Sequence, residues 1–129
     1  RDINKLDKCY IVEGYADVIS MHQAGFRNVV APLGTALTPE QIHIIQLLTK
    51  NAIELFDGDE AGIRAAMKAV DLLLKQDMNI KVLVLPEKED PDSFAQSHSA
   101  TEITNYIAQN EQDFIDFKSN ILLKRGDIN

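Results

Sequence analysis

Four short apolar segments alternate with segments of helical periodicity, and this alternation constrains the fold more than any other feature. The apolar segments are residues 8–12, 28–31, 52–56 and 81–85. Each is a nearly continuous β-rich run, as expected for a strand that helices cover on both faces. The sequence therefore predicts an α/β fold in which helices flank a central parallel sheet of about four strands.

Helical signals fill the segments between these strands. Residues 16–24 carry Val18, Met21 and His22 along one side, and Gly25 follows where a glycine often ends a helix. In the next segment Thr38 can cap a helix that starts at Pro39, and Gln41 completes a capping-box pattern. We expect that helix to end near residue 50.

Residues 60–75 form the third predicted helix, and a further helical region follows residue 99. The third helix has a buried stripe at helical spacing, formed by Ile63, Met67, Val70 and Leu74. A second stripe is predicted in the tail, formed by Ile103, Ile107, Phe114, Phe117 and Ile121. We expect one domain over residues 1–99 and a C-terminal helical extension over residues 100–129, which either packs on the sheet or begins a further subdomain.

The net charge of −7 has the wrong sign for a surface that binds nucleic acid by neutralising phosphates. The single cysteine, Cys9, lies within an apolar run and is predicted to be a core residue. His22, His43 and His98 have no ligand-like spacing, so no zinc site is predicted. No apolar run approaches the roughly 18 residues of a membrane span, and we expect a soluble, cytoplasmic protein.

Acidic residues follow three of the four predicted strands. In a parallel sheet the loops after the strands converge, and ligands bind there. Carboxylate oxygens are the ligands that suit Mg²⁺ or Mn²⁺, and such a cluster accounts for most of the net charge. The sequence therefore predicts a divalent-cation site formed by Glu13, Asp17, Asp57, Asp59, Asp90 and Asp92.

Each acidic segment also has a simpler interpretation. Asp57-Gly58 is a common turn dipeptide, Asp59 could cap the following helix, and residues 90–92 could form an exposed turn. Leu33-Gly34-Thr35 could meet a phosphate or be a plain turn, and Arg64 and Lys68 suit a solvated face. Because three such segments meet at one edge of one sheet, the metal site is favoured.

Four segments together resemble the Toprim domain of bacterial-type DNA primases over about residues 8–97. The acidic pattern alone is shared with topoisomerases, recombination mediators and some nucleases. The Glu-Gly-Tyr-x-Asp and Leu-Gly-Thr segments narrow the resemblance to primases. The four segments are Glu13-Gly14-Tyr15 with Asp17, Leu33-Gly34-Thr35-Ala36, Asp57-Gly58-Asp59-Glu60-Ala61-Gly62, and Asp90-Pro91-Asp92.

The resemblance implies that residues 1–99 form a compact catalytic Toprim domain with a Rossmann-like α/β fold. Glu13 matches a glutamate with a general acid or base role, and Asp57 and Asp59 match metal ligands. Asp17, Asp90 and Asp92 match further acidic positions of the family. Catalysis would then rest on Glu13, Asp57 and Asp59 together with Mg²⁺ or Mn²⁺.

Primases of this type are nucleotidyltransferases that make RNA primers on a single-stranded DNA template from ribonucleoside triphosphates. They act at the replication fork in the cytoplasm together with the replicative helicase. The helicase-binding part and the zinc-binding part of such a primase would lie outside these residues. We therefore expect this chain alone to bind Mg²⁺ or Mn²⁺, to hold DNA poorly and not to synthesise primers.

Two kinds of alternative remain open at this stage. Metal-bound carboxylates serve phosphodiester cleavage as well as synthesis, so a Toprim nuclease or a phage or plasmid primase–helicase fits the same residues. A non-catalytic Toprim interaction module, in which the carboxylates are surface charge, also fits. A metal titration distinguishes the module from the enzymes.

Overall fold

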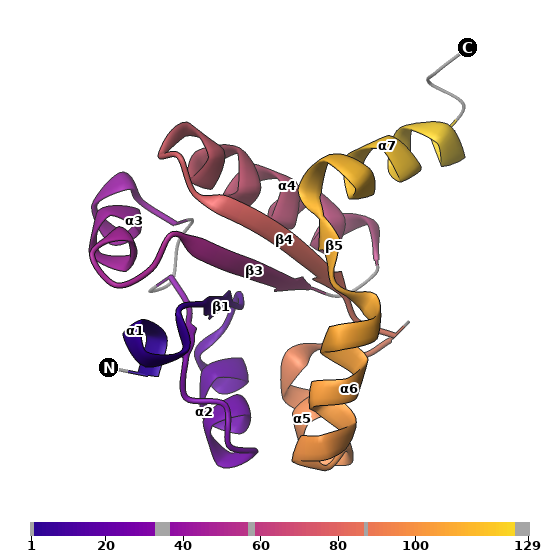
Figure 1. Ribbon diagram of the computed structural model, residues 1–129. Coiled ribbons are helices and arrows are strands. Elements are labelled where there is room, and N and C mark those ends of the chain that lie inside the picture. Colours follow the sequence, from indigo (N-terminus) through magenta and orange to yellow (C-terminus); the bar gives the residue numbers. More distant parts are fainter. Residues whose placement is uncertain (1, 33–36, 57–58, 87, 126–129) are drawn as a thin grey trace.

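A five-stranded sheet forms the centre of the computed structural model, which describes residues 2–32, 37–56, 59–86 and 88–125, without the side chains of residues 2, 4 and 121–125 (Figure 1). The strand order is β2-β1-β3-β4-β5. The first four strands pair in parallel and β5 pairs antiparallel to β4. The strands are β1 (Cys9–Ile11), β2 (Val29–Val30), β3 (Asn51–Phe56), β4 (Asn79–Val84) and β5 (Gln112–Asp113).

The predicted α/β fold is confirmed, with one additional strand. The four predicted strands are all present, and they differ from the predicted bounds by one or two residues at their ends. The sequence did not predict β5, because it consists of two exposed polar residues without any apolar alternation. In this strand Gln112 pairs with Val82 and Asp113 pairs with Lys81 at the edge of the sheet.

Helices cover both faces of the sheet (Figure 1). On one face α3, α4 and α7 pack against the sheet with residues such as Ile42, Val70 and Phe117. On the other face α2, α5 and α6 contribute Met21, Phe94 and Ile103. The helices are α1 (Asp2–Leu6), α2 (Tyr15–Gln23), α3 (Pro39–Gln46), α4 (Glu60–Lys75), α5 (Pro91–Ser97), α6 (Ala100–Asn110) and α7 (Phe114–Arg125).

Local signals explain where the helices begin, although one predicted core position, Leu74, is wrong. The Thr38 hydroxyl accepts a hydrogen bond from the Gln41 N–H at 3.2 Å, which confirms the predicted cap of α3. His22 is exposed, because α2 turns Met21 rather than its neighbour toward the sheet. In α4 the buried position is Leu73, whereas Leu74 is 42% exposed, since the buried face follows Gly62, Ala66, Val70 and Leu73.

Four of the five tail residues predicted to be buried are buried, but they are divided between the two faces of the sheet. Strand β5 separates α6 from α7, so the chain crosses from one face of the sheet to the other. Ile103 and Ile107 pack on the α2 side, and Phe114 and Phe117 pack on the α4 side. The Ile121 side chain lies outside the described residues, and the assignment of residues 100–129 to a further subdomain stays a prediction.

Two further sequence expectations concern Cys9 and membrane spans. Cys9 is fully buried in β1, and burial raises the pKa of its thiol to about 12, which confirms a core residue of low reactivity. Within the described residues, every helix is too short or too polar to cross a membrane.

Candidate metal centre

Three of the predicted acidic residues meet at the edge of the sheet where β1 and β3 end. Glu13 follows β1, Asp17 lies in the first turn of α2, and Asp90 precedes α5. All three line one cavity of about 250 Å³, together with Gly14, Leu55 and Pro91. The chain thus brings carboxylates from three separate segments to one small space, as expected for the carboxyl edge of a parallel sheet.

Asp17 joins the start of α2 to the start of α5. Its carboxylate accepts a hydrogen bond from the Gly14 N–H at 3.2 Å and another from the Asp92 N–H at 2.9 Å. Burial raises the pKa of Asp17, these two hydrogen bonds lower it, and the charges of Asp90 and Asp92 raise it further. The effects of burial and like charge exceed those of the two hydrogen bonds, so the charged form of Asp17 is destabilised. A nearby cation would stabilise it.

Asp92 is held differently from Asp17. Its carboxylate accepts hydrogen bonds from the Ser20 hydroxyl and from the Gln96 side-chain amide, the latter at 2.7 Å. The Ser20 bond and then the Gln96 bond lower the pKa of Asp92. Asp92 is therefore satisfied by the protein itself, and it fixes α2 against α5 as well as adding negative charge.

Asp59 and Asp90 both cap helices. The Asp59 carboxylate accepts a hydrogen bond from the Gly62 N–H at 2.6 Å, at the start of α4. The Asp90 carboxylate accepts one from the Ser93 N–H at 2.8 Å, at the start of α5. In each residue these bonds use one oxygen, Oδ1, so a structural cap and a cation ligand are compatible roles.

Other predicted residues cannot be placed. Asp57 and Gly58 lie outside the described residues, as does the segment from Leu33 to Ala36. Within the part of the chain that the structure describes, no group of three or more His, Cys, Asp or Glu side chains is arranged to hold a metal ion. The complete six-carboxylate centre therefore stays a prediction, while the convergence of Glu13, Asp17 and Asp90 is observed.

Sequence reasoning missed Glu54, a buried carboxyl group on β3. It is 2% exposed, and its Oε1 atom has no hydrogen-bond partner among the described residues. Burial raises the pKa of Glu54 well above its usual value, and the charge of Glu13 raises it further. A glutamate inside the apolar run of residues 52–56 was the available signal, because a strand covered on both faces seldom buries an acid.

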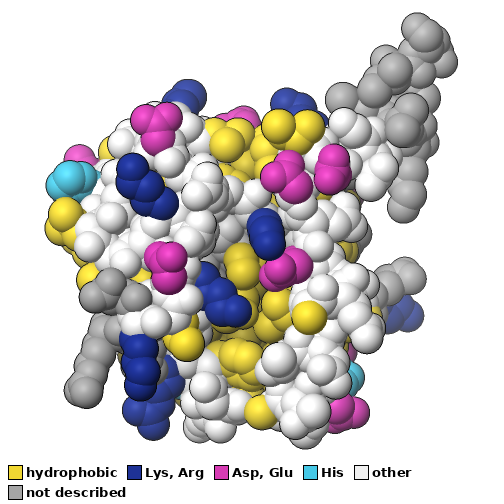
Figure 2. Space-filling model, in the orientation of Figure 1, with side chains coloured by type: hydrophobic (Ala, Val, Ile, Leu, Met, Phe, Trp, Pro, Cys, Tyr) yellow, Lys and Arg dark blue, Asp and Glu magenta, His cyan; other side chains and the backbone are white. Residues whose placement is uncertain are grey.

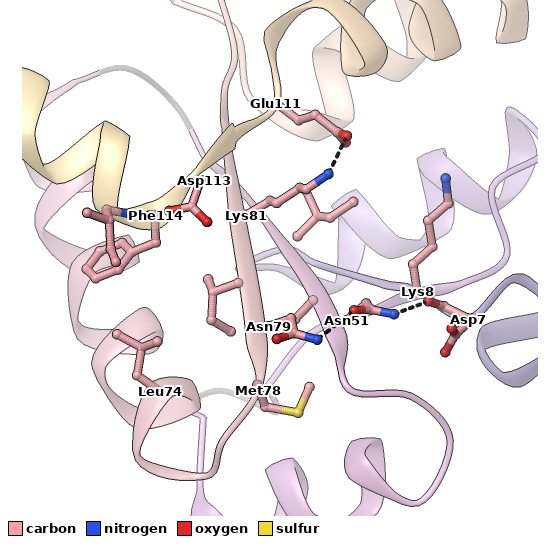
Figure 3. Close-up of a pocket in the computed structure, with 14 residues that line it drawn as sticks. Asp7, Lys8, Asn51, Leu74, Met78, Asn79, Lys81, Glu111, Asp113 and Phe114 are labelled. Carbon is pink, nitrogen blue, oxygen red and sulfur yellow. Dashed lines mark hydrogen bonds and ion pairs between the residues drawn. The ribbon is translucent and has the colours of Figure 1, made fainter.

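Another cavity, of about 620 Å³, lies at the opposite end of the sheet, where β3 and β4 begin. Figure 3 shows Asn51 between Asn79 and Asp7, and Lys81 beside Glu111. The Asn51 side chain donates to the Asp7 carbonyl at 2.9 Å and accepts from the Asn79 amide at 3.1 Å.

The face drawn in Figure 2 is hollowed near its middle, with apolar side chains on the floor and charged ones beside them.

Comparison with known proteins identifies the family. The model of the family described as Toprim-like matches residues 10–95. The DNA primase of Staphylococcus aureus is 38% identical over 122 residues, which cover 95% of this chain and 20% of that protein. The DNA primase of Staphylococcus epidermidis is 39% identical over 116 residues, which cover 90% of this chain and 19% of that protein. The chain thus spans about a fifth of the length of these relatives.

Solved structures lead to the same result. A DNA primase domain from Pseudomonas aeruginosa superposes with a TM-score of 0.83 at 36% identity, over 92% of this chain and 38% of that one. The E. coli primase catalytic core superposes with a TM-score of 0.81 at 30% identity, over 92% of this chain and 39% of that one. The resemblance to bacterial-type DNA primases is confirmed, and the chain belongs to the Toprim-like family.

Proposed function

We propose that the chain is the metal-binding catalytic part of a DNA primase, which joins ribonucleotides into an RNA primer. The observation that carries the proposal is the cavity at the carboxyl edge of the sheet, where Glu13, Asp17 and Asp90 converge. The relatives and solved structures described above are all primases, so the nuclease and interaction-module alternatives are not favoured.

Toprim domains of primases generally bind metal ions, and the residues present here fit Mg²⁺ or Mn²⁺. The donor atoms at this edge are carboxylate oxygens, which hard divalent cations prefer. Glu13, Asp59 and Asp90, with Asp57 beyond the described residues, are the ligands we propose. A divalent cation supplies charge stabilisation at the transferring phosphoryl group and lowers the pKa of the attacking hydroxyl.

The chain's own residues hold this edge in place. The cap at Asp59 fixes the start of α4, and the Asp17–Asp92 hydrogen bond fixes α2 against α5. Such fixed donors need little reorganisation when charge develops during the reaction. Glu13 follows β1 directly and is exposed beside the cavity, a position that suits proton transfer to or from a reacting hydroxyl.

The rest of the primase would supply the remaining functions. A DnaG primase catalytic domain has been solved bound to single-stranded DNA, and we extend single-stranded DNA to this chain as the template of the whole protein. The net charge of −7 favours template contacts made mainly by other domains. Ribonucleoside triphosphates as substrates, the replicative helicase as partner, and action at the replication fork in the cytoplasm belong to the same proposal.

Glu13→Gln in the full-length primase tests the proposal. We expect primer synthesis to fall by about a hundredfold or more, because a charged group at the reacting centre is lost. The free energy of unfolding should change by less than about 0.5 kcal/mol, since Glu13 is exposed. Glu111→Gln, at the other edge of the sheet, is the matched control and should retain synthesis. Near-normal synthesis by Glu13→Gln would contradict the role of Glu13.

A further inference from the structure

A second cavity adjoins Glu13 on the side of the sheet that carries α3 and α4. It has a volume of about 440 Å³ and is lined by residues of α4 on one side and by Pro32 and Leu37 on the other. Its position is the point where strand order reverses, because the chain runs from β1 outward to β2 and then returns to β3 on the other side of β1. Ligands of open α/β sheets commonly bind in this crevice.

Glu54 lies at the floor of this crevice. It pairs in register with Ile11 of β1, and it alternates along β3 with Ala52 and Phe56, which pack on the same face. The Glu54 carboxyl group is 2% exposed, yet its Oε1 atom lacks a hydrogen-bond partner in the described chain. A buried polar atom without a partner destabilises the folded chain, so a bound ligand that supplies a donor would recover this loss.

The remaining walls restrict what that ligand can be. Ile11, Leu37 and Leu72 make much of the lining apolar, and Ala65 and Ala69 of α4 leave room beside Glu54. A divalent cation needs about six oxygen ligands, which these walls do not supply. A flat ring that is apolar on its faces and carries N–H groups on its edge suits both the walls and the carboxyl group.

The rim of the crevice carries one charge of each sign. Lys68 of α4 lines the crevice and is exposed, so its ammonium group can meet a phosphate from solvent. Glu13 lines both this crevice and the cavity of the metal centre. A ligand with a ring in the crevice and an anionic tail would therefore reach toward the metal centre, which is the shape of a nucleotide.

We propose that this crevice is a nucleobase-binding subsite, in which Glu54 hydrogen-bonds to the N–H edge of a base and Lys68 faces the phosphate. The subsite deepens the proposed function, because nucleotides are the substrates of a primase, but base binding there requires no metal ion. Glu54→Gln preserves one acceptor and one donor at the floor, whereas Glu54→Leu removes both. The two variants therefore separate hydrogen bonding from packing.

Calorimetric titration of the chain with guanosine and adenosine monophosphates in the presence of EDTA tests the subsite. Ribose 5-phosphate is the control ligand without a base. We expect at least one of the two nucleotides to bind about tenfold more tightly than ribose 5-phosphate. The preference for the nucleotide over ribose 5-phosphate should be lost in Glu54→Leu and mostly kept in Glu54→Gln. Ala65→Leu should reduce this preference, because the larger side chain narrows the crevice.

Equal binding of ribose 5-phosphate and of both nucleotides, or unchanged nucleotide affinity in Glu54→Leu, would overturn the subsite. A Mn²⁺ titration of the same variants distinguishes this result from failure of the metal centre. If Mn²⁺ binds and nucleotide binding does not depend on Glu54, only the subsite is lost. If Mn²⁺ does not bind while the nucleotide still requires Glu54, the proposed catalytic function is lost and the subsite stands.

Discussion

The two edges of the sheet use polar residues in opposite ways. At the amino edge Asn51, Asn79, Asp7 and Thr49 hydrogen-bond to one another. At the carboxyl edge the charges of Asp90 and Asp92 raise the pKa of Asp17, and Oε1 of the buried Glu54 has no hydrogen-bond partner among the described residues. The hydrogen bonds at the amino edge stabilise the fold. At the carboxyl edge the incomplete pairing costs stability and leaves an acceptor for a ligand. Polar character alone therefore does not mark a functional site, whereas incomplete pairing does.

Topology explains why the acids gather at one edge. Helices α2, α4 and α5 all start where parallel strands end, and the first turn of a helix favours negative charge. Asp59 and Asp90 are therefore stabilised as caps before any metal ion is considered. Asparagine caps a helix as well as aspartate does. Replacing either residue by asparagine therefore keeps the cap and removes only the charge, which separates the structural role from the proposed functional role.

The largest effect is expected for Asp59→Asn in the full-length primase. Primer synthesis should fall by about a hundredfold, because a charged metal ligand is lost. The free energy of unfolding should stay within about 0.5 kcal/mol, because asparagine caps a helix as well as aspartate. Asp59→Ala, which removes the cap too, should also lose about 1 kcal/mol of stability. Primer assays and urea unfolding of both variants give the comparison, and full synthesis by Asp59→Asn would remove Asp59 from the centre.

Thr49→Val, at the amino edge, should lower the free energy of unfolding without affecting metal binding. The buried Thr49 hydroxyl donates to Asp7 at 2.9 Å and accepts from the Asn51 N–H at 3.1 Å. Losing both bonds at nearly constant volume should cost about 1–3 kcal/mol of unfolding free energy. Mn²⁺ affinity should not change. If Thr49→Val lowered Mn²⁺ affinity as much as Asp59→Asn does, the two edges would not be functionally distinct.

Glu54→Gln should change the pH dependence of stability. Burial raises the pKa of Glu54, so the folded chain keeps this proton to a higher pH than the unfolded chain, whose pKa is about 4.5. The contribution of Glu54 to the free energy of unfolding is therefore largest below pH 4.5 and falls as pH rises toward the raised pKa, by up to about 1.4 kcal/mol per pH unit. The variant should lose most of this fall, as urea unfolding at a series of pH values would show.

Asp17 and Glu102 provide internal checks on that pH series. The pKa of Asp17 is also raised, so a smaller fall in the same direction should persist in Glu54→Gln. Hydrogen bonds at Ser99 lower the pKa of Glu102, so Glu102→Gln should leave the fall intact. An identical pH profile for the wild type and Glu54→Gln would mean that Glu54 does not hold its proton in the folded chain.

The smallest expected effect is a shift in one titration. Ser20→Ala removes the first of the two hydrogen bonds that lower the pKa of Asp92. We expect that pKa to rise toward its ordinary value, with the Gln96 amide still opposing the rise. Carboxyl chemical shifts followed by NMR against pH would measure it, with Ser97→Ala as the control. An unchanged pKa of Asp92 in Ser20→Ala would show that the hydrogen bond from Ser20 does not lower it.

Much of this arrangement follows from local sequence signals. The apolar runs predicted all four parallel strands, and the cap at Thr38 predicted the start of α3. The segment-end aspartates predicted the acidic edge, because the carboxyl ends of parallel strands converge. Helical periodicity indicated the core side of α4 but wrongly selected Leu74 instead of Leu73, since the two neighbours lie on either side of Val70 around the helix.

Three features depended on tertiary structure. The β5 pairing requires only backbone groups, so Gln112 and Asp113 carried no strand signal. The Asp17–Asp92 hydrogen bond joins residues 75 positions apart and depends on how α2 packs against α5. Glu54 was visible as an acid in an apolar run, but only the register of β1 and β3 places it in the crevice beside Glu13.

A Mn²⁺ titration of the wild-type chain, Glu13→Gln, Asp59→Asn and Thr49→Val tests most directly whether the carboxyl edge is a cation site. Water-proton relaxation reports the bound ion without requiring catalysis. We predict that the wild type and Thr49→Val bind Mn²⁺ with equal affinity, and that Glu13→Gln and Asp59→Asn each bind it about tenfold or more weakly. No binding by the wild type, or equal affinity in all four proteins, would contradict the account.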